Sequence, residues 1–575
     1  MKINIYLFII IFSYNSNLLA QINNLFDSTF GLNGVAYHTF STDFSPKSII
    51  VASDNKIIVA GNSSGIRIAK YNENGLESDL SFGNFQGSSV YGSGFGGVSR
   101  TLQLTKCFGL PNDQILMAGI SQNPETSRNE YFLMRLNSDG SLDNTFGTNG
   151  LSYLGFVAPW NSQAASVSCL DAELSDDGFV YYAGLAASSQ ALVFARCSTN
   201  GSWDLAYGTN GFAVLNNIIG IPQYGFSLQI MPVDNNKLFV LTSDTYYHIS
   251  ETFPDSIYGW RKYPYITQLT ADGNVDSEFN SRRITPNFGL ESNNINAPFL
   301  SRVESETIIT SLIRGMDNKL YASVYFRGGW QEHISEDWNS GVFSFSSNGD
   351  LNDNWIFNQT IDAGGGLEYN CSTFGMSRHS FSSEDDYATC ISQLPDGTFF
   401  LSGYENPMAT DEFTSYITKL QNNGMPFTDF NEGNHLTFSY SESSQFERFI
   451  DASWQQGKGM IFLSPIKVGD NKQGFFMIRI ADIEDKPTKS DYNFELNQAL
   501  VYPNPTNDLI SIRSEKRISR VEVRDIKGNI VISRNVANNT DLNFNLFDFA
   551  PGIYFVYPVY ANYDAYHKPI KIIKF

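Results

Sequence analysis

The sequence contains little cysteine, and none of it forms a pattern that indicates a metal site or a disulfide framework. Five cysteines occur in 575 residues, and the odd number leaves at least one unpaired. No Cys-x-x-Cys pair and no cysteine–histidine spacing suggests zinc. Small buried thiols are therefore expected, although an oxidising compartment would allow one bridge. The cysteines are Cys107, Cys169, Cys197, Cys371 and Cys390.

Positive charge and long hydrophobic runs are also scarce. The net charge is −21 and no basic patch stands out, so binding to a nucleic-acid backbone is not expected. The apolar run Ile5–Phe12 is too short for a membrane helix, and no later segment qualifies as a membrane span. Because Lys2 precedes this run and Leu18–Ala20 follows it, residues 1–20 are predicted to be a signal peptide that is removed before Gln21.

Aromatic residues and glycine are abundant instead. A hydrophobic content of 42%, an aromatic content of 14% and 46 glycines favour an all-β fold of short strands and tight turns. A repeated unit supports this prediction: two apolar runs, Asp113–Gly119 and Tyr131–Asn137, lead to an aromatic–glycine signature in Ser138–Gly150. Degenerate copies recur along the chain. Each unit predicts four antiparallel strands, a to d, with the signature opening strand d.

The two ends of the repeat array complement each other. The first signature, in Phe26–Gly34, has no strands a to c before it, and the last set of strands, near Met460–Ser464 and Phe475–Ile480, has no signature after it. Joining the ends predicts a seven-bladed β-propeller in which an N-terminal strand closes the last blade and hides the edge strands. The recurring aromatics are expected to pack between blades. They are Phe30, Phe82, Phe146, Tyr207, Phe279, Trp355 and Phe430.

The segment Ser138–Gly150 resembles the delta-60 repeat of bacterial secreted proteins. The resemblance implies a β-propeller, assigned to residues 21–482, and a secreted protein, but it implies no reaction.

The C-terminal part has its own pattern. A polar linker is predicted over residues 483–496, and alternating apolar strands over 497–575 predict a small β-sandwich. This segment resembles the type A C-terminal sorting domain of type IX secretion cargo. The resemblance implies passage through the periplasm, recognition by the type IX machinery, and a secreted or outer-cell-surface protein from which the sorting domain is commonly removed. The matching residues are Tyr502, Pro503, Asn504, Pro505, Gly552, Lys571 and Lys574.

No residues with the spacing of a catalytic or cofactor site are found. The six histidines are scattered and are expected at the surface or in loops, and no nucleophile elbow, phosphate loop or zinc motif occurs. The Asp- and Asn-rich turns lack the closing Glu of a calcium loop and are interpreted as hairpin turns. We therefore expect no enzyme activity, no metal and no cofactor.

The insertions point to a binding face. In an antiparallel blade the a–b and c–d turns share one side and are predicted to be uniformly short, whereas the b–c loops and the d-to-a connections share the other side and contain the long insertions. Two of these segments combine aromatic residues with charge, which favours binding of an extracellular glycan or protein. One alternative is a polysaccharide hydrolase or lyase that uses Glu332, Glu336 or Asp337; another is a structural surface component. The candidate ligand-binding residues are Tyr258, Trp260, Tyr263, Trp330 and Trp338.

Overall fold

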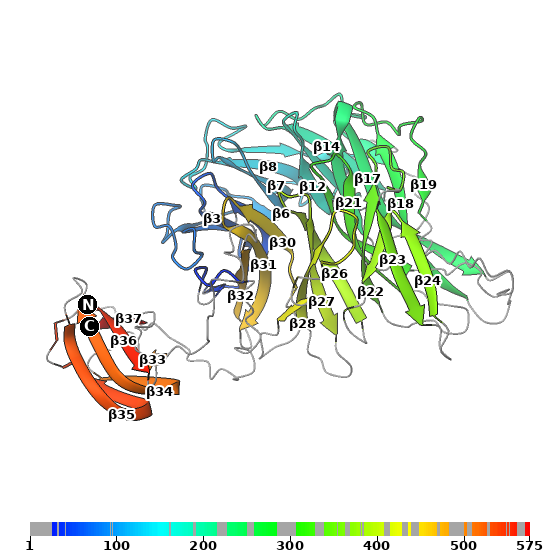
Figure 1. Cartoon of the computed structure of the whole chain (residues 1–575). Helices are drawn as coiled ribbons and strands as arrows, with labels where there is room; N and C mark the ends of the chain where they lie inside the picture. Colours follow the sequence, from blue (N-terminus) through cyan, green and yellow to red (C-terminus); the bar gives the residue numbers. More distant parts are fainter. Residues whose placement is uncertain are drawn as a thin grey trace. The chain divides into compact units, whose positions relative to one another are not determined.

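A computed structural model of the chain divides it into two compact units, Met1–Ile483 and Glu484–Phe575 (Figure 1). The structure describes residues 26–574 except 32–33, 41, 93, 95, 160–162, 188–190, 216–226, 250–257, 285–305, 328–337, 353–354, 363–367, 380, 382–384, 407–413, 428–429, 431–434, 439–447, 469–471, 482–499, 503–508, 526–529, 548, 551 and 561–569. The predicted signal peptide and the predicted linker lie outside these residues.

The described residues of the first unit form seven four-stranded antiparallel sheets, called blades 1 to 7. Blade 1 contains β2 (Ser45–Val51), β3 (Ile57–Asn62), β4 (Ile66–Tyr71) and β5 (Ser88–Tyr91). Blade 2 contains β6 (Thr101–Gly109), β7 (Ile115–Gln122), β8 (Asn129–Leu136) and β9 (Leu151–Leu154). Blade 3 contains β12 (Asp171–Leu174), β13 (Phe179–Leu185), β14 (Leu192–Ser198) and β15 (Ala213–Leu215). Blade 4 contains β16 (Leu228–Val233), β17 (Lys237–Ile249), β18 (Tyr258–Leu269) and β19 (Arg282–Arg283). Blade 5 contains β20 (Glu306–Arg314), β21 (Leu320–Arg327), β22 (Asn339–Phe345) and β25 (Met376–His379). Blade 6 contains β26 (Asp385–Gln393), β27 (Phe399–Asn406), β28 (Thr414–Leu420) and β29 (Leu436–Phe438). Blade 7 contains β30 (Asp451–Gln455), β31 (Gly459–Val468), β32 (Lys472–Ala481) and β1 (Val35–Thr39).

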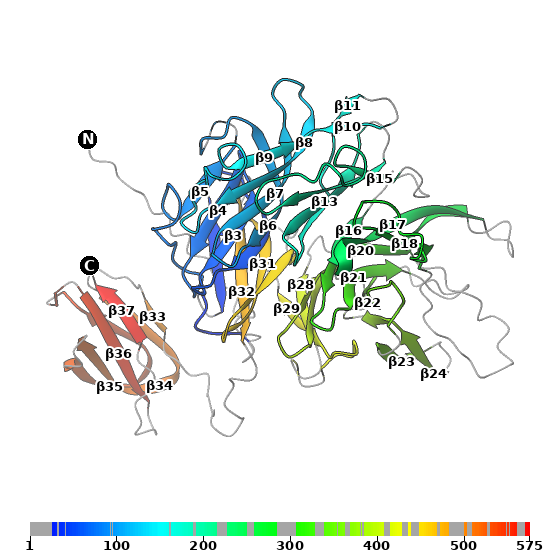
Figure 2. The same cartoon turned by 90° about the horizontal axis from the view of Figure 1, so that it is seen from above.

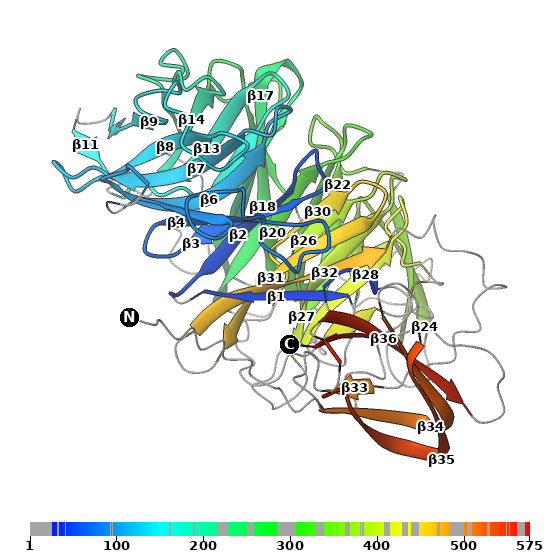
Figure 3. The same ribbon diagram turned by 90° about the vertical axis from the view of Figure 1, so that its left-hand side faces the viewer.

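The blades form a closed ring. Strand a of each blade contacts strand a of the next, and β30 of blade 7 contacts β2 of blade 1, so the colours in Figure 2 run once around the unit and return to blue. The N-terminal strand β1 pairs with β32 from Val35↔Ile478 to Thr39↔Gly474 (Figure 3). The predicted propeller, closed by the N-terminal strand, is thus confirmed.

The aromatic signature was predicted to begin strand d, but in the structure it lies before that strand. Phe30 precedes β1 by several residues, and Phe146 lies before β9, so each signature forms part of the c–d connection. An Asx turn explains this placement: Asp143 accepts a hydrogen bond from the backbone of Thr145 at 3.0 Å, and the Phe146 amide donates to the carbonyl of Asp143 at 3.0 Å. The turn bends the chain before strand d begins.

Each signature aromatic packs at the seam between two blades, as expected. The seven rings are between 0 and 8% exposed. Gly140, at φ +77°, belongs to the c–d turn of blade 2, and a Cβ there would lie 2.6 Å from the ring of Phe82 in blade 1. Glycine is therefore required by both the turn and the close approach. The equivalent pairs are Phe30–Gly75, Phe82–Gly140, Phe146–Gly201, Tyr207–Gly273, Phe279–Gly349 and Trp355–Gly424.

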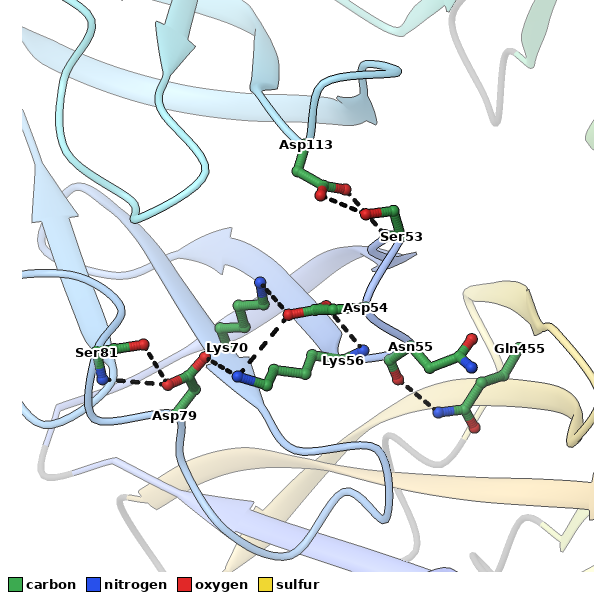
Figure 4. Close-up of polar contacts among 9 residues, drawn as sticks. All are labelled: Ser53, Asp54, Asn55, Lys56, Lys70, Asp79, Ser81, Asp113 and Gln455. Carbon is green, nitrogen blue, oxygen red and sulfur yellow. Dashed lines mark hydrogen bonds and ion pairs between the residues drawn. The ribbon is translucent and has the colours of Figure 1, made fainter.

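Polar contacts join blade 1 to both of its neighbours (Figure 4). The Ser53 amide donates to Asp113 of blade 2 at 2.8 Å, and Gln455 of blade 7 donates to the carbonyl of Asn55 at 2.6 Å. Within blade 1, Lys56 pairs with the signature carboxylate Asp79 at 2.8 Å. The a–b turns and signature carboxylates therefore stabilise the ring.

The two sides of the propeller differ less than predicted. A small hairpin, β10 (Phe156–Val157) and β11 (Ala164–Ala165), occurs in a d-to-a connection, on the expected side. A larger hairpin, β23 (Ile356–Asp362) and β24 (Glu368–Phe374), is inserted between strands c and d of blade 5. The expectation that every c–d connection is short is therefore wrong. Only the a–b turns are uniformly tight, as in the turn Asp234–Asn236 between β16 and β17.

Two histidines do not lie at the surface or in loops as expected. His379 in β25 is 3% exposed, and the ring of His38 in β1 packs at a tilt against that of Tyr71, with ring centroids 4.0 Å apart. His38 also bonds the carbonyl of Gly75 at 2.7 Å. Both occupy strands rather than loops; His379 is buried there and His38 is half-buried. The described cysteines, Cys107, Cys169, Cys197 and Cys390, are free thiols.

The second unit is the predicted small β-sandwich. It contains β33 (Leu500–Tyr502), β34 (Leu509–Asp525), β35 (Ile530–Asn545), β36 (Gly552–Tyr560) and β37 (Ile570–Lys574). The first part of β34 pairs with β33 and its later part with β36, while β35 pairs along both parts. Of the sorting residues, Gly552 lies opposite Lys574 across β36 and β37, Lys571 lies in β37 and Tyr502 in β33; Pro503–Pro505 lie outside the described residues.

Candidate ligand-binding site

Four half-buried aromatic side chains form one cluster on blades 5 and 6, which we call the aromatic ledge. The ring of Trp338 lies 5.1 Å from that of Tyr325, and Tyr325 lies 5.0 Å from Tyr387. Tyr387 stacks on Tyr404 at 4.8 Å. The rings are therefore continuous across two blades.

The topology places the ledge on the side that carries the b–c loops. Tyr325 and Tyr404 lie near the ends of the b strands β21 and β27, Tyr387 lies near the start of β26, and Trp338 directly precedes the c strand β22. In an antiparallel blade the end of b and the starts of a and c share one side. This is the side for which the sequence predicts a binding function.

Asp385 holds the centre of the ledge. Its carboxylate accepts the backbone amide of Trp338 at 2.8 Å and the hydroxyl of Tyr387 at 2.8 Å. The amide of Asp386 donates to the carbonyl of Trp338 at 2.7 Å, so the backbone of Trp338 is bonded on both sides. The ledge is thus preorganised, which lowers the entropy cost of binding.

The phenols of the ledge stay neutral. Burial, the hydrogen bond to Asp385 and its charge raise the pKa of Tyr387, and burial raises the pKa of Tyr404. Both groups can therefore stack and form hydrogen bonds at neutral pH, but neither is poised to act as a general base.

The structure places one of the five sequence-predicted ligand residues in this ledge, Trp338. Trp330, with the alternative acidic residues Glu332–Asp337, lies outside the described residues. Tyr258, Trp260 and Tyr263 were expected in a loop, but their backbones belong to β18, which pairs with β17 up to Ile249↔Tyr258. Aromatic residues favour strands, and here they extend the b–c hairpin of blade 4.

The ledge residues Tyr325, Tyr387 and Tyr404 were not predicted from the sequence as ligand-binding residues. They lie within strands, where a tyrosine normally contributes to the core, as the fully buried Tyr182 does. One signal was available, since Asp385 and Asp386 stand directly before Tyr387 in place of the apolar residues of a buried strand.

The strands a surround a cavity of about 510 Å³, which we call the channel. Its lining includes Lys47, Lys106, Ser311 and Asp451 but none of the four ledge residues. Lys106 forms an ion pair with Glu173 of blade 3. Burial raises the pKa of Glu173 to about 7 and that of Asp451 to about 6.

The channel carboxylates have a structural role. Asp451 accepts the amide of Ile49 in the next blade at 2.9 Å, and Asp171 accepts that of Ile230 at 2.8 Å. Ser48 and Ser311 do the same, as they accept the amides of Cys107 and Ile391, each at 3.1 Å. Aspartate and serine thus occupy equivalent positions that join neighbouring strands a, which accounts for the aspartates without a catalytic role.

In the described part of the chain, no group of three or more His, Cys, Asp or Glu side chains could hold a metal ion. Among the same residues, no helix has the length and apolar character needed to cross a membrane.

Two family profiles match parts of the chain. Residues 500–572 match the secretion system C-terminal sorting domain, and residues 52–76 and 110–146 match a β-propeller domain of unknown function, DUF5122. The chain therefore carries a type IX sorting domain behind a β-propeller, and it is a secreted or outer-surface protein. None of the curated proteins matches the chain.

Several solved structures resemble the chain at low identity. An ulvan lyase of polysaccharide lyase family PL25 is 9% identical, with a TM-score of 0.39 over 77% of this chain and 96% of its own. The propeller domain of the trilobed protease from Pyrococcus furiosus is 9% identical, with a TM-score of 0.36 over 79% of this chain and 100% of its own. The endo-arabinase from Bacteroides thetaiotaomicron is 10% identical, with a TM-score of 0.28 over 55% and 94%. Structural similarity at this level does not indicate what this chain binds.

Proposed function

We propose that the propeller is a non-catalytic binding module of a secreted protein and that it binds an extracellular glycan on the aromatic ledge. The supporting observation is the continuous set of half-buried rings, Tyr325, Trp338, Tyr387 and Tyr404, on the loop-bearing side. Aromatic side chains combine an apolar ring with a polar group, and clustered rings of this kind dominate binding sites.

The chemistry of the ledge favours a glycan over a protein ligand. A sugar presents an apolar ring face surrounded by hydroxyl groups, which matches rings that stack together with neutral phenols that donate and accept hydrogen bonds. Asp385 bonds the hydroxyl of Tyr387 and the backbone amide of Trp338, so the side chain of Tyr387 and the backbone of Trp338 are ordered before a ligand binds.

The proposal is tested by measuring the binding of the secreted chain to a panel of soluble polysaccharides, by calorimetry or affinity electrophoresis. Trp338→Ala is expected to weaken binding about tenfold or more, because one stacking ring is worth roughly 1–3 kcal/mol. Tyr153→Ala is the matched control, since Tyr153 is a half-buried tyrosine of β9 that lies outside the ledge. Unchanged binding by Trp338→Ala, or equal losses in both variants, would contradict the proposal.

A polysaccharide hydrolase or lyase is the second candidate. It is favoured by one pair near the ledge: His435 lies 3.4 Å from Glu405, the residue after Tyr404. The imidazole packs against Phe381 with ring centroids 4.8 Å apart, which leaves it little access to a substrate. Release of reducing or unsaturated ends from any bound polysaccharide, abolished by His435→Gln, would establish this candidate in place of the first.

A further inference from the structure

One buried carboxylate holds two arginines of the sorting domain in a fixed arrangement. Glu522 in β34 is 3% exposed. One of its oxygens pairs with Arg524 at 2.9 Å, and the other pairs with Arg520 at 3.4 Å. Alternate residues of a strand share one side of the sheet, so the three charged residues lie together on one side of β34. The carboxylate offsets only one of the two positive charges.

Aromatic residues of β36 extend this charged surface. Tyr557 lies directly opposite Glu522, and Phe555 lies directly opposite Arg524. Residues that face each other across two strands share one side of a sheet. The guanidinium of Arg524 lies 4.9 Å from the ring centroid of Tyr557, and both aromatic residues are half-buried. We call Arg520, Glu522, Arg524, Phe555 and Tyr557 the basic face.

The hydrophobic core of the sorting domain lies on the other side of the sheet. Val521 and Val523 alternate with the charged residues of β34, and both are fully buried in the core with Val556 of β36. The arginines of the basic face stay accessible, since the side chain of Arg520 is 40% exposed and that of Arg524 is 27% exposed. An ion pair whose carboxylate is withdrawn from water contributes little net stability. The stability of the domain therefore does not explain the basic face.

Charge and residue type indicate which kind of partner the basic face fits. Residues 484–575 contain 12 lysines and arginines and 11 aspartates and glutamates, whereas the whole chain has a net charge of −21. Arginine and aromatic residues are enriched at protein interfaces, and a planar guanidinium matches a carboxylate. Anionic membranes attract clusters of about four to eight Lys or Arg residues, more than this face contains. An acidic protein surface is the better match.

We propose that the sorting domain docks through the basic face on an acidic protein surface of the type IX secretion machinery. This inference concerns export and is independent of the glycan-binding function of the propeller. The position of the face supports it. Lys571, one of the residues that the chain shares with sorting domains, lies directly opposite Phe555 across β36 and β37. The basic face therefore borders the strand that carries the end of the sorting motif.

The test measures the export of the full chain from a bacterium that has a type IX secretion system. After a pulse of synthesis, the chain in the medium and on the cell surface is compared with the chain retained in the periplasm. Arg524→Gln is expected to slow export about tenfold, because a hydrogen bond to a charged group is lost. Arg524→Lys keeps the charge and should retain most of the rate. Arg534→Gln is the matched control, since Arg534 is exposed and lies opposite Val521, on the other side of the sheet.

Glu522→Gln separates docking from a structural role. It breaks the same ion pair as Arg524→Gln but keeps both cations, so docking on an acidic partner predicts nearly normal export. Equal losses for Glu522→Gln and Arg524→Gln would mean that the ion pair only stabilises the domain, and the inference would be overturned. Export of Arg524→Gln at the rate of Arg534→Gln would also overturn it. A thermal melt of each purified chain establishes that it is folded.

A photo-crosslinking residue in place of Tyr557 identifies what contacts the basic face during export. Benzoylphenylalanine keeps an aromatic ring at this position and reacts with neighbouring molecules when cells are irradiated. A crosslink to a component of the type IX machinery that disappears in the Arg524→Gln chain would support the inference. A crosslink to lipopolysaccharide or to a second copy of this chain, with none to the machinery, would contradict it.

Discussion

The seams between blades and the aromatic ledge use the same residue types for different purposes. At the seams, rings such as Phe146 are fully buried against a glycine of the next blade, and they recur in every unit. On the ledge, Tyr325, Tyr387 and Tyr404 are half-buried and contact one another across blades 5 and 6, and Tyr387 bonds to the carboxylate of Asp385. None of the three belongs to the repeated aromatic signature. The comparison teaches that repetition marks residues that stabilise the ring, whereas departure from repetition marks residues available for binding.

Removal of residues 21–39 is expected to have the largest effect, because it deletes the strand that completes the last seam. Without β1, the full edge of β32 would be exposed, and open edges pair with other chains. We expect loss of a cooperative unfolding transition and association detectable by light scattering. A chain that lacks only residues 21–25 retains β1 and should remain monodisperse; if the longer deletion behaves like this control, closure by β1 does not stabilise the ring.

Phe146→Ala is expected to have the next largest effect and to affect stability alone. It removes a ring that is 0% exposed, between Gly201 and the guanidinium of Arg135 at 4.8 Å. The free energy of unfolding should fall by about 3–5 kcal/mol, measured by urea denaturation, with little change in glycan affinity. The ledge variant Tyr387→Ala should show the opposite pattern. If Phe146→Ala and Tyr387→Ala changed the free energy of unfolding and the glycan affinity equally, the distinction between seam residues and ledge residues would be wrong.

Acid should weaken the seam at β1 through His38. Burial lowers the pKa of His38 to about 4, against an ordinary value of 6.5, so the folded chain keeps the ring neutral while the unfolded chain protonates it. Stability is therefore lost as the pH falls from about 6.5 to about 4. Since the ring is not fully buried, a loss of about 2 kcal/mol is expected. His38→Gln retains a donor for Gly75 and should lack this part of the acid dependence; parallel pH curves for both proteins would contradict the prediction.

Tyr387→Phe should have the smallest effect and would sharpen the account of the ledge. It removes the hydrogen bond to Asp385 but keeps the ring. Stability should fall by about 0.5–1 kcal/mol, and glycan affinity by a few fold, less than for Tyr387→Ala. Calorimetric titration of both variants tests this order. Equal losses would mean that the hydroxyl rather than the ring face makes the contact.

Most of the fold could be predicted from the sequence, because the repeat encodes it many times. The aromatic of each signature, the Gly of each turn and the unmatched ends of the array predicted the ring and its closure. Local details were predicted less well. Tyr258 and Trp260 were expected in an insertion loop but belong to the long hairpin of β17 and β18, since aromatic residues favour strands.

The candidate site was only partly predictable. Trp338 was identified because it lies in an insertion, outside the repeat. Tyr387 and Tyr404 were not, because a tyrosine near a strand end has the same local sequence as one in the core. Their pairing across β26 and β27, and their contact with Tyr325 of the neighbouring blade, depend on how the blades are arranged.

The sequence by itself determined the destination of the protein, the number of repeated units and the closure of the ring, since these depend on local signals and on the order of segments. Only the tertiary structure decided which side chains are accessible together. Tyr325 of blade 5 and Tyr387 of blade 6 are far apart in the sequence, and the contact of their rings at 5.0 Å arises from the packing of the two blades. No local pattern records such a contact, because it depends on how neighbouring blades are arranged.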